Sequence, residues 1–144
     1  MKMTMMTSNH VPQIAALEKL CFSDPWSEGS IAAELNNPLS CWLVAEHEGA
    51  VLGYIGSQSV CGEADMMNVA VHPEHRRKGI AEALVTALIQ TLRRNDVMSL
   101  TLEVRISNEP AKKLYEKLGF LQAGCRKNYY RHPKEDALIL RKEL

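Results

Sequence analysis

The sequence has no excess of charge of either sign, since 17 lysines and arginines balance 17 aspartates and glutamates. A protein that grips nucleic acid through its whole surface carries a basic excess, so this balance argues against direct nucleic-acid binding. Basic residues gather only in short segments, at Arg76 to Lys78 and at Arg126 and Lys127. Positive charge is therefore expected at particular sites rather than across the surface.

Long apolar runs are also missing. No segment approaches the roughly 20 apolar residues that a membrane-spanning helix needs. The segment from Met1 to Thr7 carries a lysine but no apolar core of signal-peptide length. We therefore expect a soluble, cytoplasmic protein without membrane contact. The chain of 144 residues, 46% of them hydrophobic, is long enough for one domain over residues 1–144 with a core of its own.

Cysteine motifs are absent as well. The four cysteines (Cys21, Cys41, Cys61 and Cys125) stand far apart, with no Cys-x-x-Cys pair and no Cys/His cluster at zinc spacing. We therefore expect no metal site. The pattern favours reduced, mostly buried thiols, as in a cytosolic protein.

Apolar periodicity predicts strands that begin antiparallel and later alternate with helices, which indicates a mixed α/β sheet with helices on both faces. The expected strands are an N-terminal edge strand up to Thr7, then Cys41–Ala45, Val51–Gln58, Glu63–Val71, Ser99–Arg105, Leu121–Arg126 and Ala137–Arg141. The expected helices are a stripe from Val11 to Cys21, a short helix up to Asn36, Gly79–Arg94, and a helix from Asn108 to Gly119.

The segment from Asn68 to Ala81 carries the first functional signal. A short apolar strand ends at a proline turn, a basic cluster and Gly79 follow, and a helix then begins. This order aims free backbone N–H groups and the positive end of a helix at phosphate. The segment lacks the Gly-Lys-Ser/Thr ending of a P-loop and the three glycines of a dinucleotide fingerprint. A helix that simply starts beside a basic surface cluster would explain it equally well.

Glu103 lies in the middle of a predicted strand, between Leu102 and Val104. A carboxylate in a central strand is costly to desolvate unless it is paired or functional. The alternative is an ion pair with Arg105 or another neighbour. Tyr115 shares a helical stripe with apolar residues, and a packed aromatic with a wet hydroxyl would explain it without any catalytic role.

Taken together, these motifs resemble one known family. The signature Gln/Arg-x-x-Gly-x-Gly/Ala is met by Arg76, Gly79 and Ala81, and Ser107–Phe120 is a second specific match. Over essentially its whole length the chain resembles the Gcn5-related N-acetyltransferases (GNAT), which implies a centrally splayed sheet. It is most similar to the RimI-type ribosomal protein alanine N-acetyltransferases. The segments that support this branch are Pro25-Trp26-Ser27, Leu102–Arg105, Arg126–Tyr130 and Glu135–Ala137.

The resemblance implies acetyl-CoA as the acetyl donor. The strand that ends at Val71 would pair with the pantetheine arm. The N–H groups of Arg77 to Glu82 would hold the pyrophosphate at the positive end of the helix that follows Gly79. Asn108 is carried over as a further contact, although a helix cap explains it equally well. The implied cofactor contacts are Val69, Ala70, Val71, Arg76, Arg77, Lys78, Gly79, Ile80, Ala81, Glu82 and Asn108.

The resemblance also assigns the chemistry, which is direct acetyl transfer to an amine. Glu103 matches the general base, Tyr115 matches the general acid for the CoA thiolate, and a backbone N–H near Val71 would polarise the carbonyl. None of the cysteines lies at a matched catalytic position, which disfavours a covalent route. An α-amine, with a pKa of about 7.7–8.0 against about 10.4 for lysine, is cheaper to deprotonate by about 3.4 kcal/mol.

The acceptor is the least constrained part of the hypothesis. We expect the N-terminal alanine of a small-subunit ribosomal protein, entering between Trp26 and the pair Tyr129 and Tyr130. Trp26 could equally be a core anchor, and strand alternation should let only one of the tyrosines face the site. The alternatives are acetylation of a small amine or of a protein lysine, or a non-catalytic acetyl-CoA-binding module. A module would need neither Glu103 nor Tyr115.

Overall fold

All residues from 1 to 144 are described by the computed structural model, whose strands and helices follow the predicted order. The elements are β1 (Lys2–Met5), α1 (Val11–Cys21), α2 (Glu28–Glu34), β2 (Ser40–His47), β3 (Ala50–Val60), β4 (Glu63–Val71), a short 3-10 helix η1 (Pro73–His75), α3 (Ile80–Arg94), β5 (Ser99–Arg105), α4 (Glu109–Lys117), β6 (Leu121–Arg131) and β7 (Lys134–Glu143).

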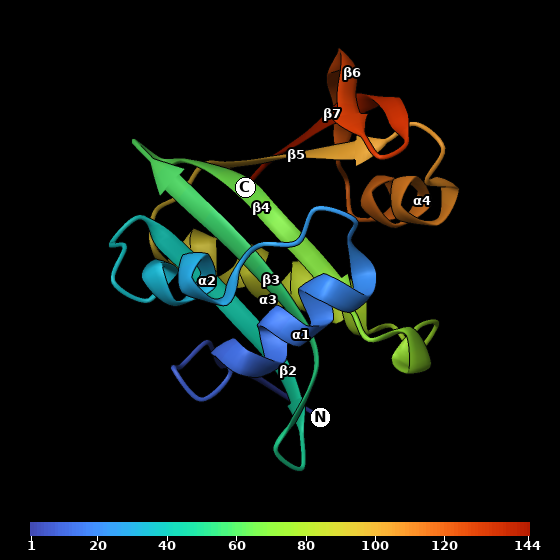
Figure 1. Ribbon diagram of the computed structural model, residues 1–144. Helices are drawn as coiled ribbons and strands as arrows, with labels where there is room; N and C mark the ends of the chain where they lie inside the picture. Colours follow the sequence, from blue (N-terminus) through green and yellow to red (C-terminus); the bar gives the residue numbers. More distant parts are fainter.

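The strands form one mixed sheet in the order β1-β2-β3-β4-β5-β7-β6 (Figure 1). Neighbouring strands are antiparallel except for β4 and β5, which run parallel. These two strands pair only at their beginnings, Glu63–Asp65 with Ser99–Thr101, and separate beyond that point. The predicted mixed sheet with a central splay is therefore confirmed.

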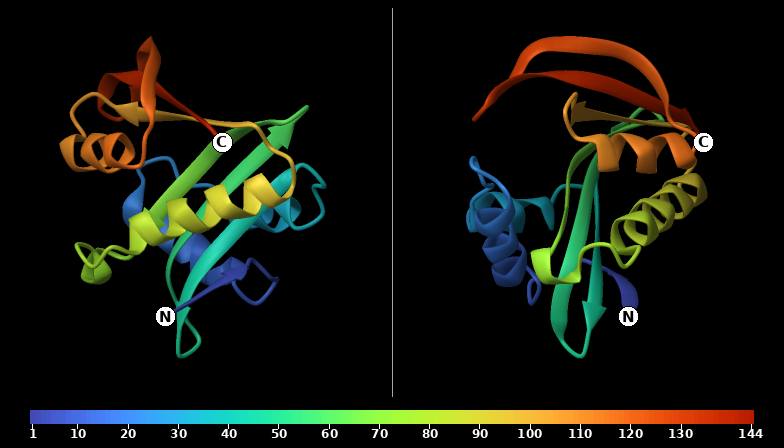
Figure 2. Two further views of the ribbon diagram at one scale, coloured as in Figure 1. Left: turned by 180° about the vertical axis from the view of Figure 1, so that it is seen from behind. Right: turned by 90° about the vertical axis from the view of Figure 1, so that its right-hand side faces the viewer.

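Helices cover both faces of the sheet, as predicted. Helices α1 and α2 lie on one face, and α3 and α4 lie on the other (Figure 2). Each face has its own apolar cluster, one that includes Ile14 and Tyr54 and a larger one that includes Leu84, Leu100 and Tyr115. None of the helices combines the length and the apolarity that crossing a membrane requires.

The C-terminal hairpin is longer than the sequence predicts. Strand β6 continues to Arg131 and β7 begins at Lys134, so the segment between the predicted strands Leu121–Arg126 and Ala137–Arg141 is mostly strand, with a tight turn at His132 and Pro133. The pairing register shifts between Arg126 and Tyr130, which marks a bulge in β6. Because β6 is an exposed edge strand, it has no alternation of apolar and polar residues from which its length could be predicted.

The cysteines correct one expectation. All four are free thiols, but Cys61 and Cys125 are exposed and the other two are half-buried, so the prediction of mostly buried cysteines is wrong. Cys61 lies in the turn between β3 and β4, and Cys125 lies on the edge strand β6. The spacing of cysteines along the sequence indicates whether they can form a disulfide or bind a metal, but it does not tell how deeply each thiol is buried.

Candidate active site

The loop from β4 into α3 presents a row of free backbone donors. The N–H groups of all six residues from Arg77 to Glu82 find no acceptor within the protein, and the first helical bond of this region runs from Ala83 N–H to Gly79 O. Positive φ angles at Arg77 (64°) and Gly79 (78°) curl the chain here. Free N–H groups in a curled loop that enters a helix form an anion-binding concavity.

Gly79 is the residue that this turn requires. It is the N-cap of α3 in the left-handed conformation, where side chains other than glycine are strained. A Cβ atom built at Gly79 meets nothing within 4 Å, so the space beside it is open to a ligand. The free N–H groups at the helix start therefore face space that no protein group beside Gly79 occupies.

Arg76 points back towards the protein instead of outwards. Its Nε atom donates to the Val71 carbonyl oxygen at 3.2 Å, and an Nη atom lies 3.6 Å from the Cys21 sulfur. The side chain thus fixes the end of β4 relative to the loop. Nothing in these contacts tests whether Arg76 also touches a cofactor.

The edge of β4 beyond the splay has unpaired backbone groups. His72 N–H donates to Leu52 O on β3 at 2.8 Å. Along an antiparallel ladder every second residue bonds to the partner strand, so Ala70 also faces β3, and the residues between face the other way. Val69 and Val71 therefore turn their N–H and C=O groups away from β3, towards the side from which β5 has separated. The Val69 N–H reaches the Asn68 side-chain oxygen at 3.1 Å. An extended ligand could pair with this edge as a strand would.

Glu103 sits on β5 with its side chain 23% exposed. Its ion-pair partner is not Arg105, as considered from the sequence, but Arg126 of β6, whose Nε atom lies 3.4 Å from Oε1. Arg105 is occupied elsewhere, by Glu135 and by the carbonyl oxygens of the hairpin turn. The carboxylate is therefore paired and still accessible, which is what a proton acceptor requires.

Tyr115 is buried on α4, edge-on to Phe120 with ring centroids 5.4 Å apart. Its hydroxyl lies 3.8 Å from the sulfur of Met66, the residue that follows the last paired position of β4. The hydroxyl thus lies where the two strands separate. Burial, with a smaller effect from Tyr130, raises the pKa of Tyr115 to about 12, so the phenol is protonated at neutral pH.

The bulge in β6 places both Tyr129 and Tyr130 on the same side. Their rings meet edge-on at 5.1 Å, so the alternation expected along a regular strand does not hold here. Burial is the main cause that raises the pKa of Tyr130 to about 12, and Glu103 contributes to it. Tyr130 in turn contributes to the raised pKa of Tyr115, so its ring stands electrostatically between the two predicted catalytic residues.

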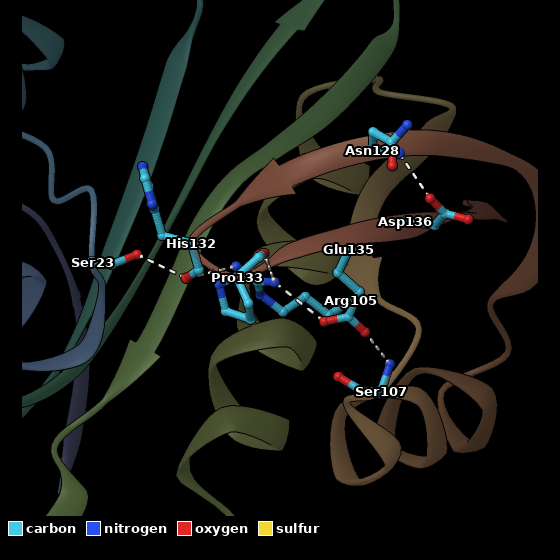
Figure 3. Close-up of polar contacts among 8 residues, drawn as sticks. All are labelled: Ser23, Arg105, Ser107, Asn128, His132, Pro133, Glu135 and Asp136. Atoms are coloured by element: carbon cyan, nitrogen blue, oxygen red, sulfur yellow. Dashed lines mark hydrogen bonds and ion pairs between the residues drawn. The ribbon is translucent and has the colours of Figure 1, made fainter.

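Arg105 holds the tip of the hairpin over this region (Figure 3). Its guanidinium donates to Pro133 O at 2.9 Å and to Glu135 Oε1 at 3.2 Å, and it stacks 4.2 Å from the centre of the Tyr130 ring. The other Glu135 oxygen accepts from Ser107 N–H at 2.7 Å. The Ser107 bond, together with Arg105, holds the pKa of Glu135 below its usual range.

The hairpin turn also touches the loop between α1 and α2. Ser23 Oγ donates to His132 O at 3.2 Å (Figure 3). Trp26 lies in the same loop, half-buried and edge-on to Trp42 at 5.4 Å. Its packing supports a role as a core anchor, and nothing in the structure tests a contact with an acceptor.

Sequence reasoning missed Glu18. This carboxylate is fully buried and accepts from the Tyr54 hydroxyl, from the Asn68 amide and from Trp26 N–H, the last at 3.1 Å. It joins the α1–α2 loop to strands β3 and β4. The available signal was its place on the apolar stripe, four residues after Ile14 and three before Cys21.

Asn108 caps α4, because its side-chain oxygen accepts from Ala111 N–H at 3.2 Å. The capping interpretation is therefore confirmed. A contact with a cofactor stays a prediction.

Comparison with known proteins gives a consistent result. The sequence profile of the acetyltransferase (GNAT) family matches residues 11–120. The chain is 36% identical over 132 residues to the [ribosomal protein bS18]-alanine N-acetyltransferase of Escherichia coli K12, which covers 90% of this chain and 88% of that one. The crystal structure of the ribosomal-protein-S18-alanine N-acetyltransferase from Escherichia coli has a TM-score of 0.91 at 33% identity, covering 99% and 92% of the two chains. The fold is also shared with Arabidopsis thaliana NAA60 in complex with acetyl-CoA, at a TM-score of 0.89, 13% identity, and coverage of 99% and 98%.

Proposed function

This chain belongs to the acetyltransferase (GNAT) family, and we propose that it transfers the acetyl group of acetyl-CoA to the N-terminal alanine of a ribosomal protein. The family match and the relative that shares 36% of its residues over most of both chains support the acceptor. The observation that carries the activity is one juxtaposition. A row of free N–H groups at α3 follows the edge of β4 that has separated from β5, the protonated phenol of Tyr115 lies against Met66 at the point of separation, and the Glu103 carboxylate stands on β5.

The donor fits the residues that are present. The six N–H groups from Arg77 to Glu82 match the need of a pyrophosphate, and the α3 dipole adds about half a positive charge at that end. The Val69 C=O and the Val71 N–H, which face away from β3 and have no partner along this edge, are the groups that the amides of the pantetheine arm can pair with. The Val69 N–H and the Val71 C=O, by contrast, are held by Asn68 and Arg76. Acetyl-CoA supplies the activated acetyl group, and the protein supplies the position and the protons.

The proposed roles in the transfer follow from protonation. Glu103 takes a proton from the acceptor ammonium, directly or through water, and the freed amine nitrogen forms the new bond to the acetyl carbon. The Val71 N–H stabilises the negative charge on the carbonyl oxygen. The bond from carbon to sulfur then breaks, and Tyr115 gives its proton to the leaving thiolate. The nitrogen loses its second proton to solvent, and Tyr115 regains its proton from solvent. Tyr115 can do so because its pKa of about 12 keeps it protonated.

The acceptor would enter beside Tyr129 and Tyr130, under the contact between the hairpin turn and the α1–α2 loop. Both rings lie near Glu103, because its charge contributes to the raised pKa of each hydroxyl. Tyr129 is 47% exposed and can contact a peptide without rearrangement. Trp26 would act indirectly, by fixing the loop on the other side of the entrance.

A peptide panel tests the acceptor. The protein is incubated with acetyl-CoA and peptides that begin with Ala, Ser, Met or Gly, together with an N-terminally blocked lysine peptide, and released CoA is measured. We expect the Ala peptide to have the largest kcat/KM, by about tenfold or more over the lysine peptide. The α-amine is deprotonated at lower cost, by about 2.5 pKa units. Acetylation of the lysine peptide alone would overturn the N-terminal assignment.

Gly79→Ala tests the phosphate site. The added Cβ would stand beside the free N–H groups, so we expect the KM for acetyl-CoA to rise about tenfold, with a smaller change in kcat. The left-handed φ also costs about 1–2 kcal/mol of stability. Gly49→Ala is the matched control, because Gly49 has a φ of 82° and open space around it, but lies in the β2–β3 turn. An equal effect of both variants on KM would contradict the site.

A further inference from the structure

The ion pair between Glu103 and Arg126 joins the predicted base to a cation from the edge of the sheet. Arg126 precedes the bulge of β6 and reaches Glu103 through a single nitrogen at 3.4 Å. The Arg126 side chain is 56% exposed, against 23% for Glu103. The base therefore carries a counter-charge that comes from the solvent side of the site.

The two arginines near the site are held differently. Arg105 has three polar contacts in addition to its stacking on Tyr130. Arg126 has only the contact with Glu103 and a distant position over the Tyr129 ring, 5.7 Å from its centre. Exposed ion pairs with one contact contribute little to stability. Arg126 can therefore leave Glu103 without disturbing the hairpin, whereas Arg105 cannot leave its partners so easily.

The acceptor amine arrives with the same charge as Arg126. An α-amine with a pKa of about 7.7–8.0 is mostly an ammonium ion at neutral pH. Glu103 must approach this group to receive its proton, and the guanidinium of Arg126 stands against Oε1 of the same carboxylate. Two cations cannot share one partly exposed carboxylate without repulsion.

We propose that Arg126 is an exchangeable counter-ion, which pairs with Glu103 in the free enzyme and is displaced by the ammonium group of the acceptor. This inference rests on the proposed function and adds a determinant of acceptor affinity to it. Arg126 keeps the carboxylate neutralised until an amine enters. A molecule without a cationic amine cannot replace Arg126 at Glu103, so it gains no binding energy from this carboxylate.

The test is Arg126→Gln, assayed with an alanine peptide whose other residues are uncharged. Without the competing cation the acceptor KM should fall about two- to fivefold, the range that an exposed ion pair can supply. The KM for acetyl-CoA should stay constant. Lys127→Gln is the matched control, because it removes the same charge from the next residue, which has no ion pair with Glu103, and it should leave the acceptor KM unchanged.

The salt dependence of the acceptor KM distinguishes an exchangeable Arg126 from one with a merely structural role. In the wild type one cation replaces another at Glu103, so the acceptor KM should change little between about 0.05 and about 0.5 M salt. In Arg126→Gln the ammonium meets an unpaired carboxylate, and its KM should rise clearly over the same range. A raised acceptor KM in Arg126→Gln, an unchanged one, or equal effects of both variants would overturn the proposal.

Failure of the proposed acceptor would look different. If the wild type acetylated only a lysine peptide, the N-terminal assignment would be wrong. The same pair of variants would then be assayed on that peptide, whose ε-ammonium carries the same charge. Melting temperatures of all three proteins show whether either substitution disturbs the fold.

Discussion

Replacing Glu103 by glutamine should reduce kcat at neutral pH by about 100-fold or more, the usual contribution of a positioned general base. Glutamine keeps the size of the side chain but cannot accept the proton of the ammonium. The deficit should shrink as pH rises through about 8, because the free α-amine then forms without help. Initial rates of peptide acetylation between about pH 6.5 and 9.5 measure both effects.

Glu103→Gln should leave the affinity for acetyl-CoA unchanged, because Glu103 is on β5 and the proposed contacts with acetyl-CoA are on β4 and α3. Calorimetric titration with CoA provides this measurement. Glu63→Gln is the control, because Glu63 is an exposed carboxylate with its own arginine partner, Arg141, at the opposite end of the strand from the loop. Wild-type turnover in Glu103→Gln at neutral pH would show that the base is wrongly assigned.

Replacing Tyr115 by phenylalanine should also lower kcat by about 100-fold, because the CoA thiolate would leave without its proton. The hydroxyl has only the Met66 sulfur as a partner, at 3.8 Å, so the loss of stability should stay below about 1 kcal/mol. The pKa of Tyr115 is about 12 and the acid form is the active one. Activity that depends on this proton is therefore fully present at neutral pH and lost only as pH rises through about 12.

Single-turnover rates and urea unfolding separate the two consequences for Tyr115→Phe. Tyr54→Phe provides the contrast, because the Tyr54 hydroxyl donates to the buried Glu18. Its removal takes one donor from a buried carboxylate, at a cost of about 1–3 kcal/mol. Tyr54→Phe should thus lower stability more than Tyr115→Phe and lower kcat less. A variant Tyr115→Phe that keeps its rate would contradict the role of the acid.

Much of the architecture could be predicted from local pattern. The apolar run before Pro73 and the stripe of α3 place a strand and a helix on either side of Gly79, and the structure has both. The mixed sheet follows from the order of such elements, and the splay follows from the family resemblance. Each of these features depends on residues close together in the sequence, which is why a single sequence can reveal them.

The missed features depend on residues far apart. Glu18 meets Tyr54 and Asn68 only because α1 packs across two strands, and its burial contradicts the usual preference of a glutamate for solvent. Arg126 reaches Glu103 across β7, the strand that lies between theirs. The bulge that puts Tyr129 beside Tyr130 is marked by neither glycine nor proline, and its one signal is Asn128, which adopts the left-handed conformation there with φ 55°.

The short ladder between β4 and β5 has a consequence for the lifetime of the protein. Strand pairing between the two halves of the sheet is limited to Glu63–Asp65 with Ser99–Thr101, beside one more backbone bond from Met98 N–H to Gly62 O. In the proposed binding mode acetyl-CoA occupies the gap, and a ligand that binds only the folded state at 100 times its Kd adds about 2.7 kcal/mol to stability. When acetyl-CoA is scarce, the halves would open more often and expose the chain to proteases.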